Sequence, residues 1–162
     1  MARDYQTDAG RCDRWRIAAA WEWELEKSYP VYVVDDDPGV HDWAHIVCAE
    51  RELNCRTFWS GDEFLEEAGG LMPGCVLLDM RMPRRSGLQV QAEIVKRGLN
   101  MPVIAMTGYG DVEVAVQSMK LGAVDFLEKP FPQEVLLEAL SQGFKRIEQM
   151  LERPARAEPQ GR

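Results

Sequence analysis

The stretch VYVVDDDPGV, residues 31–40, sets the expected fold of the chain. Its first four residues are apolar or β-prone, as is typical of a buried strand, whereas Pro38 suits the first turn of a helix. Three aspartates, Asp35, Asp36 and Asp37, stand between the two. A buried strand that runs through acidic residues into a helix predicts the first strand–helix unit of a sheet, with negative charge placed at the end of the strand.

The same strand-then-helix pattern recurs along the chain. Helix starts carry capping signals, such as Ser60 three residues before Glu63 and Asp111 ahead of an apolar run. The expected strands are 31–34, 55–59, 75–79, 102–107 and 123–129, and the expected helices start at Pro38 and cover 60–68, 86–98, 111–122 and 132–152. Five strands that alternate with helices predict an α/β fold with a parallel sheet covered on both faces.

Polar residues stand where these strands end. They are Asp35 and Asp36 after the first strand, Asp79 at the third, Thr107 at the fourth and Lys129 at the fifth. Ligands of parallel sheets bind beyond the carboxyl ends of the strands, so these residues are expected to converge. Three crowded carboxylates repel one another unless a hard cation joins them, and Mg²⁺ suits such an oxygen cluster and also binds phosphate oxygens. With a lysine and a hydroxyl beside them, the sequence predicts a site for Mg²⁺ and a transferring phosphoryl group.

Residues 30–150 resemble the receiver domain of two-component response regulators. The motifs VVDDD, LLDMRMPRRSGL, IAMTGYGD and FLEKPF carry this resemblance, and TGYGDVEVAVQSMKLGAVDFLEKPF is further similar to the FixJ/LuxR-type transcriptional regulators. The resemblance implies a flavodoxin-like, doubly wound five-stranded sheet with strand order 2-1-3-4-5. It divides the chain into an N-terminal extension, helical or disordered, at 1–28, a receiver domain at 29–152, and a disordered tail or linker stub at 153–162.

The resemblance also assigns chemical roles. Asp79 would be the phospho-acceptor, whose carboxylate attacks the phosphohistidine of a sensor histidine kinase. Mg²⁺ would be held by Asp36 directly, by Asp35 largely through water, by Asp79, and by the backbone carbonyl of Arg81. Lys129 would contact the phosphoryl group. Such a chain would not be an enzyme beyond its own phosphotransfer and autodephosphorylation.

Further positions match the switch of the family. Thr107 would be the switch hydroxyl, Phe126 the switch aromatic, and Pro130 the proline that follows a cis peptide bond. Arg81 and Tyr109 would flank the path of the hydrolytic water and so tune the lifetime of the acyl phosphate. The expected output is homodimerisation through the face built from the fourth helix, the fifth strand and the fifth helix.

Several residues have a simpler interpretation as well. Asp37 is expected only to begin the first helix rather than to be a third metal ligand. His41 and His45 have a spacing that can bind metal, but without a third ligand they are expected on a solvated helix face. Arg84 and Arg85 follow the acceptor strand and could meet the kinase or the phosphate, or could simply be solvated.

Two other function classes remain as alternatives. Haloacid-dehalogenase phosphatases also begin with a strand and an acidic pair, which would make Asp35 the nucleophile and Asp37 the acid. That alternative is disfavoured because no acidic metal motif follows Lys129 and because Asp79 would have no role. A phosphorylation-independent binding module is disfavoured because the acidic, threonine and lysine set is complete.

Composition limits the remaining possibilities. The 162 residues, 46% hydrophobic and 28% charged, are typical of one soluble domain. No apolar run approaches the roughly 18 residues of a membrane span and no secretory leader is evident, so a cytoplasmic protein without membrane contact is expected. A net charge of −8 disfavours direct nucleic-acid binding by this chain. Its cysteines, Cys12, Cys48, Cys55 and Cys75, are expected to be reduced structural thiols.

Overall fold

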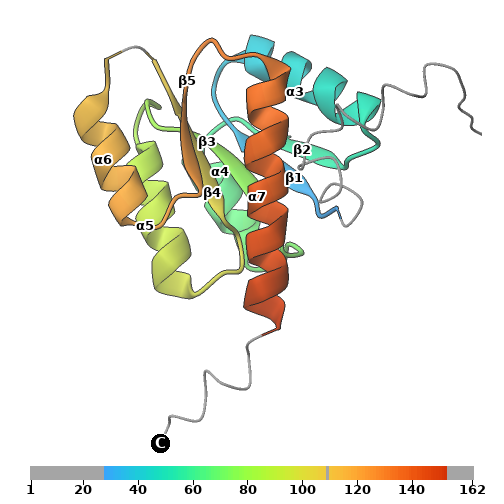
Figure 1. Ribbon diagram of the computed structural model, residues 1–162. Helices are drawn as coiled ribbons and strands as arrows, with labels where there is room; N and C mark the ends of the chain where they lie inside the picture. Colours follow the sequence, from blue (N-terminus) through green and yellow to red (C-terminus); the bar gives the residue numbers. More distant parts are fainter. Residues whose placement is uncertain (1–27, 109, 153–162) are drawn as a thin grey trace, which may run out of the picture.

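A computed structural model describes residues 28–108 and 110–152 of the protein. The predictions for the N-terminal extension, for the tail and for Tyr109 fall outside these residues. The fold is a five-stranded parallel sheet in the order β2-β1-β3-β4-β5, with helices on both faces (Figure 1). The predicted α/β class, the doubly wound sheet and the strand order are therefore confirmed.

Strands and helices alternate along the chain as the sequence predicts. The strands are β1 (Val31–Val34), β2 (Cys55–Phe58), β3 (Cys75–Asp79), β4 (Val103–Thr107) and β5 (Asp125–Glu128). The helices are α3 (Pro38–Glu50), α4 (Gly61–Ala68), α5 (Gly87–Arg97), α6 (Val112–Lys120) and α7 (Gln133–Leu151). None of the helices in the described part of the chain is both long enough and apolar enough to cross a lipid bilayer.

Side-chain alternation in the strands builds two apolar layers. In β1, Val31 and Val33 point into the layer that α3 and α7 cover, whereas Tyr32 and Val34 point into the layer that α4 and α5 cover. All four side chains are buried, because β1 is an inner strand of a sheet with helices on both faces. This rigid sheet fixes the positions of the residues at its carboxyl edge.

Some element boundaries are narrower than predicted. Strand β2 ends at Phe58, so Trp59 lies outside it and is half exposed. Strand β5 begins at Asp125 rather than at Ala123, because the N–H of Ala123 donates to the carbonyl of Ser118 and so belongs to the end of α6. The predicted strand at 102–107 begins one residue later, at Val103.

Glycine at position 87 allows α5 to begin directly behind the end of β3. A Cβ atom at Gly87 would lie 2.5 Å from the backbone oxygen of Asp79 and 2.6 Å from the Cα of Met80. No side chain fits at such distances, so the SGL motif is required by the close approach of α5 to the end of β3.

Candidate functional site

Three carboxylates converge at the carboxyl edge of the sheet, as predicted. Asp35 follows β1, Asp36 comes next, and Asp79 is the last residue of β3. One carboxylate oxygen from each lies within 4.8 Å of the others. Asp35 and Asp79 are buried, whereas Asp36 is exposed, so the cluster opens to solvent on one side.

One ammonium group partly neutralises this cluster. Lys129 Nζ lies 3.0 Å from Asp35 Oδ2 and 3.7 Å from Asp79 Oδ1. Backbone groups add two hydrogen bonds: the N–H of Asp37 donates to Asp35 Oδ1 over 3.0 Å and the N–H of Arg81 donates to Asp79 Oδ1 over 3.1 Å. Asp35 is therefore bound more tightly by the lysine than Asp79 is, which leaves Asp79 the freer of the two buried acids.

The surroundings of Asp79 make its carboxylate harder to ionise than an ordinary aspartate. Burial and the neighbouring Asp35 carboxylate raise the pKa of Asp79 to about 6, although the N–H of Arg81 and the ammonium of Lys129 oppose the rise. Burial by itself would lower the pKa of Lys129, but the hydrogen bond and attraction of Asp35 outweigh it and the pKa is raised. The carboxylates thus carry more negative charge than the lysine offsets. A set of oxygen ligands with excess negative charge and an open side fits a hard divalent cation.

Thr107 lies beside the end of β3, but its hydroxyl donates to a residue outside the carboxylate cluster. It ends β4, where Met106 is the strand partner of Asp79, and its side chain is buried. Thr107 Oγ1 donates to Asp111 Oδ2 over 2.5 Å. Arg81 Nε donates to the same carboxylate over 2.9 Å, and Arg81 Nη2 pairs with its other oxygen.

Asp111 differs from its predicted role. It occupies the N-cap position of α6, but its side chain makes no capping hydrogen bond. The carboxylate is instead used by Arg81 and Thr107, which lower the pKa of Asp111 to about 2. Asp111 was predicted only as a helix cap and not as part of the site; its only signal in the sequence is its place four positions after Thr107.

His41 corrects another prediction. The residue is buried rather than on a solvated helix face: its Nε2 lies 2.7 Å from the backbone oxygen of Asp35, and its ring stacks on Trp59 with centroids 3.9 Å apart. The prediction was wrong because α3 turns this position toward the end of β2, where Trp59 covers it. His45, one turn later, is exposed as predicted. Asp37 begins α3 as predicted, accepting a hydrogen bond from the N–H of Gly39.

The other expected positions lie near the same edge or on a neighbouring surface. The Lys129–Pro130 peptide bond is cis, the isomer that the resemblance implies. Phe126 is half-buried and packs against the apolar layer under α4 and α5. Cys48, Cys55 and Cys75 are free thiols.

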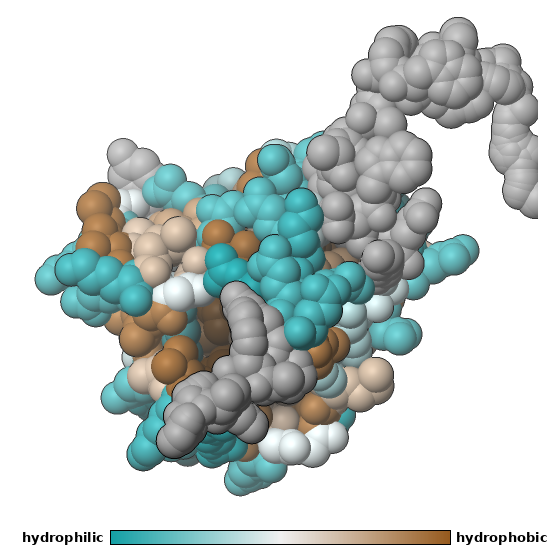
Figure 2. Space-filling view, turned by 60° about the horizontal axis from the view of Figure 1, so that its bottom comes forward, coloured by the Kyte–Doolittle hydropathy of each residue, from teal (hydrophilic) through white to brown (hydrophobic). Residues whose placement is uncertain are grey.

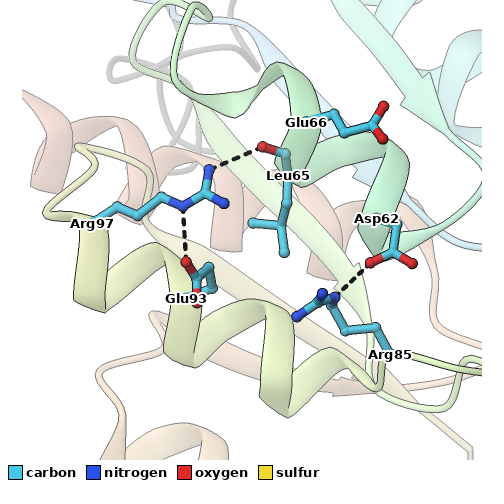
Figure 3. A pocket seen from close by; sticks show the side chains of 6 residues that line it. All are labelled: Asp62, Leu65, Glu66, Arg85, Glu93 and Arg97. Atoms are coloured by element: carbon cyan, nitrogen blue, oxygen red, sulfur yellow. Dashed lines mark hydrogen bonds and ion pairs between the residues drawn. The ribbon is translucent and has the colours of Figure 1, made fainter.

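Arg85 belongs to a different surface from the carboxylate cluster. Its Nε pairs with Asp62 Oδ1 at 2.6 Å across a cavity of about 380 Å³ between α4 and α5 (Figure 3). Arg97 on the other side of that cavity pairs with Glu93 and donates to the backbone oxygen of Leu65. Arg85 therefore forms an exposed ion pair with Asp62, away from the carboxylate cluster.

Comparison with known proteins agrees with the geometry. Residues 31–141 match the response regulator receiver domain. The chain is 41% identical over 135 residues to the transcriptional regulatory protein FixJ of Azorhizobium caulinodans, covering 83% of this chain and 64% of that protein. It is 39% identical over 122 residues to the response regulator protein TmoT of Ectopseudomonas mendocina, covering 75% of this chain and 56% of that protein. The chain thus spans less than two thirds of these relatives.

Solved structures give the same result. The crystal structure of FixJ-N superposes with a TM-score of 0.69 at 35% identity, covering 73% of this chain and 94% of that one. Full-length FixJ from B. japonicum superposes with a TM-score of 0.72 at 35% identity, covering 78% of this chain and 62% of that one. The haloacid-dehalogenase alternative is not supported by these matches. The chain belongs to the response regulator receiver domain family and, within it, to the FixJ type.

Proposed function

We propose that this chain is the phospho-accepting receiver of a two-component phosphorelay, and that Asp79 takes its phosphoryl group from the phosphohistidine of a sensor histidine kinase. The observation that carries the proposal is the convergence of the Asp79 carboxylate with Asp35, Asp36 and Lys129 at one open edge of the sheet. Asp79 is the buried acid that Lys129 holds less closely, so its oxygen is the one best placed to react.

Phosphoryl transfer from the kinase to Asp79 needs no reactant beyond these two groups and a metal ion. A carboxylate oxygen of Asp79 attacks phosphorus, the phosphorus–nitrogen bond breaks, and the electron pair returns to the imidazole nitrogen of the kinase. Asp35, Asp36, Asp79 and the backbone carbonyl of Arg81 would hold Mg²⁺, which when bound neutralises charge on the phosphoryl oxygens. Lys129 would leave Asp79 free to react and then bind the new phosphoryl group. Hydrolysis of the acyl phosphate restores Asp79.

The output would be a change in the face formed by α6, β5 and α7. Exposed apolar side chains lie on α6 at helical spacing: Val112, Val116 and Met119. Apolar atoms gather on the side of the molecule where α6 lies (Figure 2). Phosphorylation would move Thr107 and Phe126 and make this face pair with a second copy of the chain. Because these α6 side chains are exposed rather than buried in the core, they favour a role for α6 in signalling over a role in folding alone.

The process controlled is inferred from the relatives. FixJ and TdiR are named transcriptional regulatory proteins, so transcriptional control in the cytoplasm is the proposed setting. An acidic chain with a net charge of −8 is a poor ligand for DNA, so contact with DNA would come from a segment or partner other than this domain.

The proposal is tested by incubating the purified protein with acetyl phosphate and Mg²⁺ and measuring its intact mass. The expected result is one phosphoryl adduct of about 80 Da, lost in Asp79→Asn and lost when the metal is chelated. An unmodified mass in the wild-type protein would reject the mechanism and favour a phosphorylation-independent binding module.

A further inference from the structure

The Thr107 hydroxyl has a single proton, and it donates that proton in a hydrogen bond to Asp111. A threonine hydroxyl can donate one hydrogen bond at a time. Thr107 Oγ1 uses that donor on Asp111 Oδ2, over 2.5 Å. While this bond exists, Thr107 has no proton to donate to a phosphoryl oxygen on Asp79, which ends the neighbouring strand. Asp111 and a phosphoryl group therefore compete for the same donor.

Arg81 holds the competing carboxylate in place. Its Nε donates to Asp111 Oδ2 over 2.9 Å and its Nη2 pairs with Asp111 Oδ1, so the guanidinium binds both oxygens. A two-point contact of this kind fixes the orientation of a carboxylate better than a single ion pair does. Arg81 stands two residues after Asp79, and its own N–H donates to the Asp79 carboxylate. The restraint on Thr107 is thus attached to the loop that follows the phospho-acceptor.

The position of Asp111 connects this restraint to α6. Asp111 is the N-cap residue of α6, yet its side chain forms no cap. Helix capping therefore does not explain its orientation, whereas the contacts with Thr107 and Arg81 do. Once the Thr107 bond breaks, the first turn of α6, which carries the exposed Val112, loses one of its attachments to β4.

We propose that Asp111 is a positioning residue of the switch: held by Arg81, it keeps the Thr107 hydroxyl away from the acceptor site and so disfavours the phosphorylated conformation. The inference rests on the proposed function, because it assumes that Thr107 binds the phosphoryl group. Removing Asp111 is expected to make that conformation easier to reach. Arg81 then acts through the carboxylate that it orients.

The test measures equilibrium binding of beryllofluoride, a phosphoryl analogue that binds carboxylates, with Mg²⁺ present. Loss of one charge-assisted hydrogen bond predicts about fivefold tighter binding by Asp111→Ala. Arg81→Ala is expected to tighten binding less than Asp111→Ala does. Asp111→Asn keeps an oxygen acceptor, so its affinity should lie between that of the wild type and that of Asp111→Ala. Glu113→Ala removes an exposed acid from the same helical turn and is the matched control, with binding unchanged.

A double-mutant cycle separates the contact from a general effect of charge. In the Thr107→Ala background there is no hydroxyl to release, so adding Asp111→Ala should change binding by less than about twofold. Unchanged or weaker binding by Asp111→Ala, an equal gain in the Thr107→Ala background, or an equal gain in Glu113→Ala would each overturn the inference. Failure of the wild-type protein to bind beryllofluoride would reject the proposed function as well. Thermal unfolding of each variant shows whether it is folded.

Discussion

Lys129 Nζ lies closer to Asp35 Oδ2, at 3.0 Å, than to Asp79 Oδ1, at 3.7 Å. The lysine therefore serves mainly as the counter-ion of Asp35. A cation bound by the carboxylates would neutralise Asp35 in place of Lys129. The ammonium of Lys129 would then be free to bind a phosphoryl group on Asp79. Under the proposed function, Lys129 would compete with Mg²⁺ for the carboxylates before phosphorylation and would bind the phosphoryl group afterwards.

Lys129→Ala should separate these two roles. Without the competing positive charge, Mg²⁺ affinity is expected to rise by about threefold to tenfold, whereas phosphorylation by acetyl phosphate should slow by at least about tenfold because a charge-stabilising group is lost. Tryptophan fluorescence can follow the Mg²⁺ titration, since Trp43 lines the same cavity as Lys129. Weaker Mg²⁺ binding in the variant would contradict the competition.

The raised pKa of Asp79 predicts a pH-dependent cost to stability. Because the folded protein holds the pKa of Asp79 at about 6, above the ordinary value of 3.8 for an aspartate, the Asp79 contribution to stability is most favourable in acid and is lost as pH rises from about 4 to 6. Without metal, Asp79→Asn should be more stable than the wild type by about 1–2 kcal/mol at pH 7.5, and the advantage should shrink toward pH 5. Urea unfolding at both pH values, with and without Mg²⁺, measures it. A variant less stable than the wild type at pH 7.5 would refute the repulsion.

His41 is expected to support the proposed metal site through the backbone of Asp35. Since its buried ring bonds the backbone oxygen of Asp35 and stacks on Trp59, His41→Leu should cost about 1–3 kcal/mol of unfolding free energy and weaken Mg²⁺ binding. His45→Leu, on the exposed side of the same helix, is the matched control and should leave both unchanged. Equal effects of the two substitutions would remove the special role of His41.

The α6 face can be tested with a charge. Val116→Asp places a desolvated carboxylate in the proposed dimer interface, so it should weaken the phosphorylation-dependent dimer by at least about tenfold. Asp79 should still be phosphorylated. Val95→Asp, at a similarly exposed position on α5, is the control and should still dimerise. Sedimentation with acetyl phosphate and Mg²⁺ gives the dimer fraction, and a normal dimer in Val116→Asp would place the interface elsewhere.

The fold was predictable because each element carries its own local signal. The apolar runs of β1, β3 and β4 and the capping residues of α4 and α5 are adjacent in sequence, and parallel sheets bring strand ends to one edge whatever the loops contain. That rule was sufficient to predict that Asp35 and Asp79 lie close together. It depends on the topology alone.

Other contacts depend on residues that sequence does not bring together. His41 is buried only because Trp59, from the end of β2, covers it. Asp111 reads as a helix cap, and its use by Thr107 and Arg81 arises from the relative placement of two loops at the sheet edge. Both residue types have common surface roles, so periodicity could not distinguish those roles from the ones observed.

The central claim is that Asp79 itself becomes an acyl phosphate. Its most direct test is reduction with borohydride after incubation with acetyl phosphate and Mg²⁺, followed by peptide mass spectrometry, because borohydride converts an aspartyl phosphate into homoserine. We predict homoserine at position 79 alone. When metal is omitted, the same peptide should keep its aspartate. Homoserine at Asp35 or Asp36, or an intact aspartate at position 79 in phosphorylated protein, would contradict it.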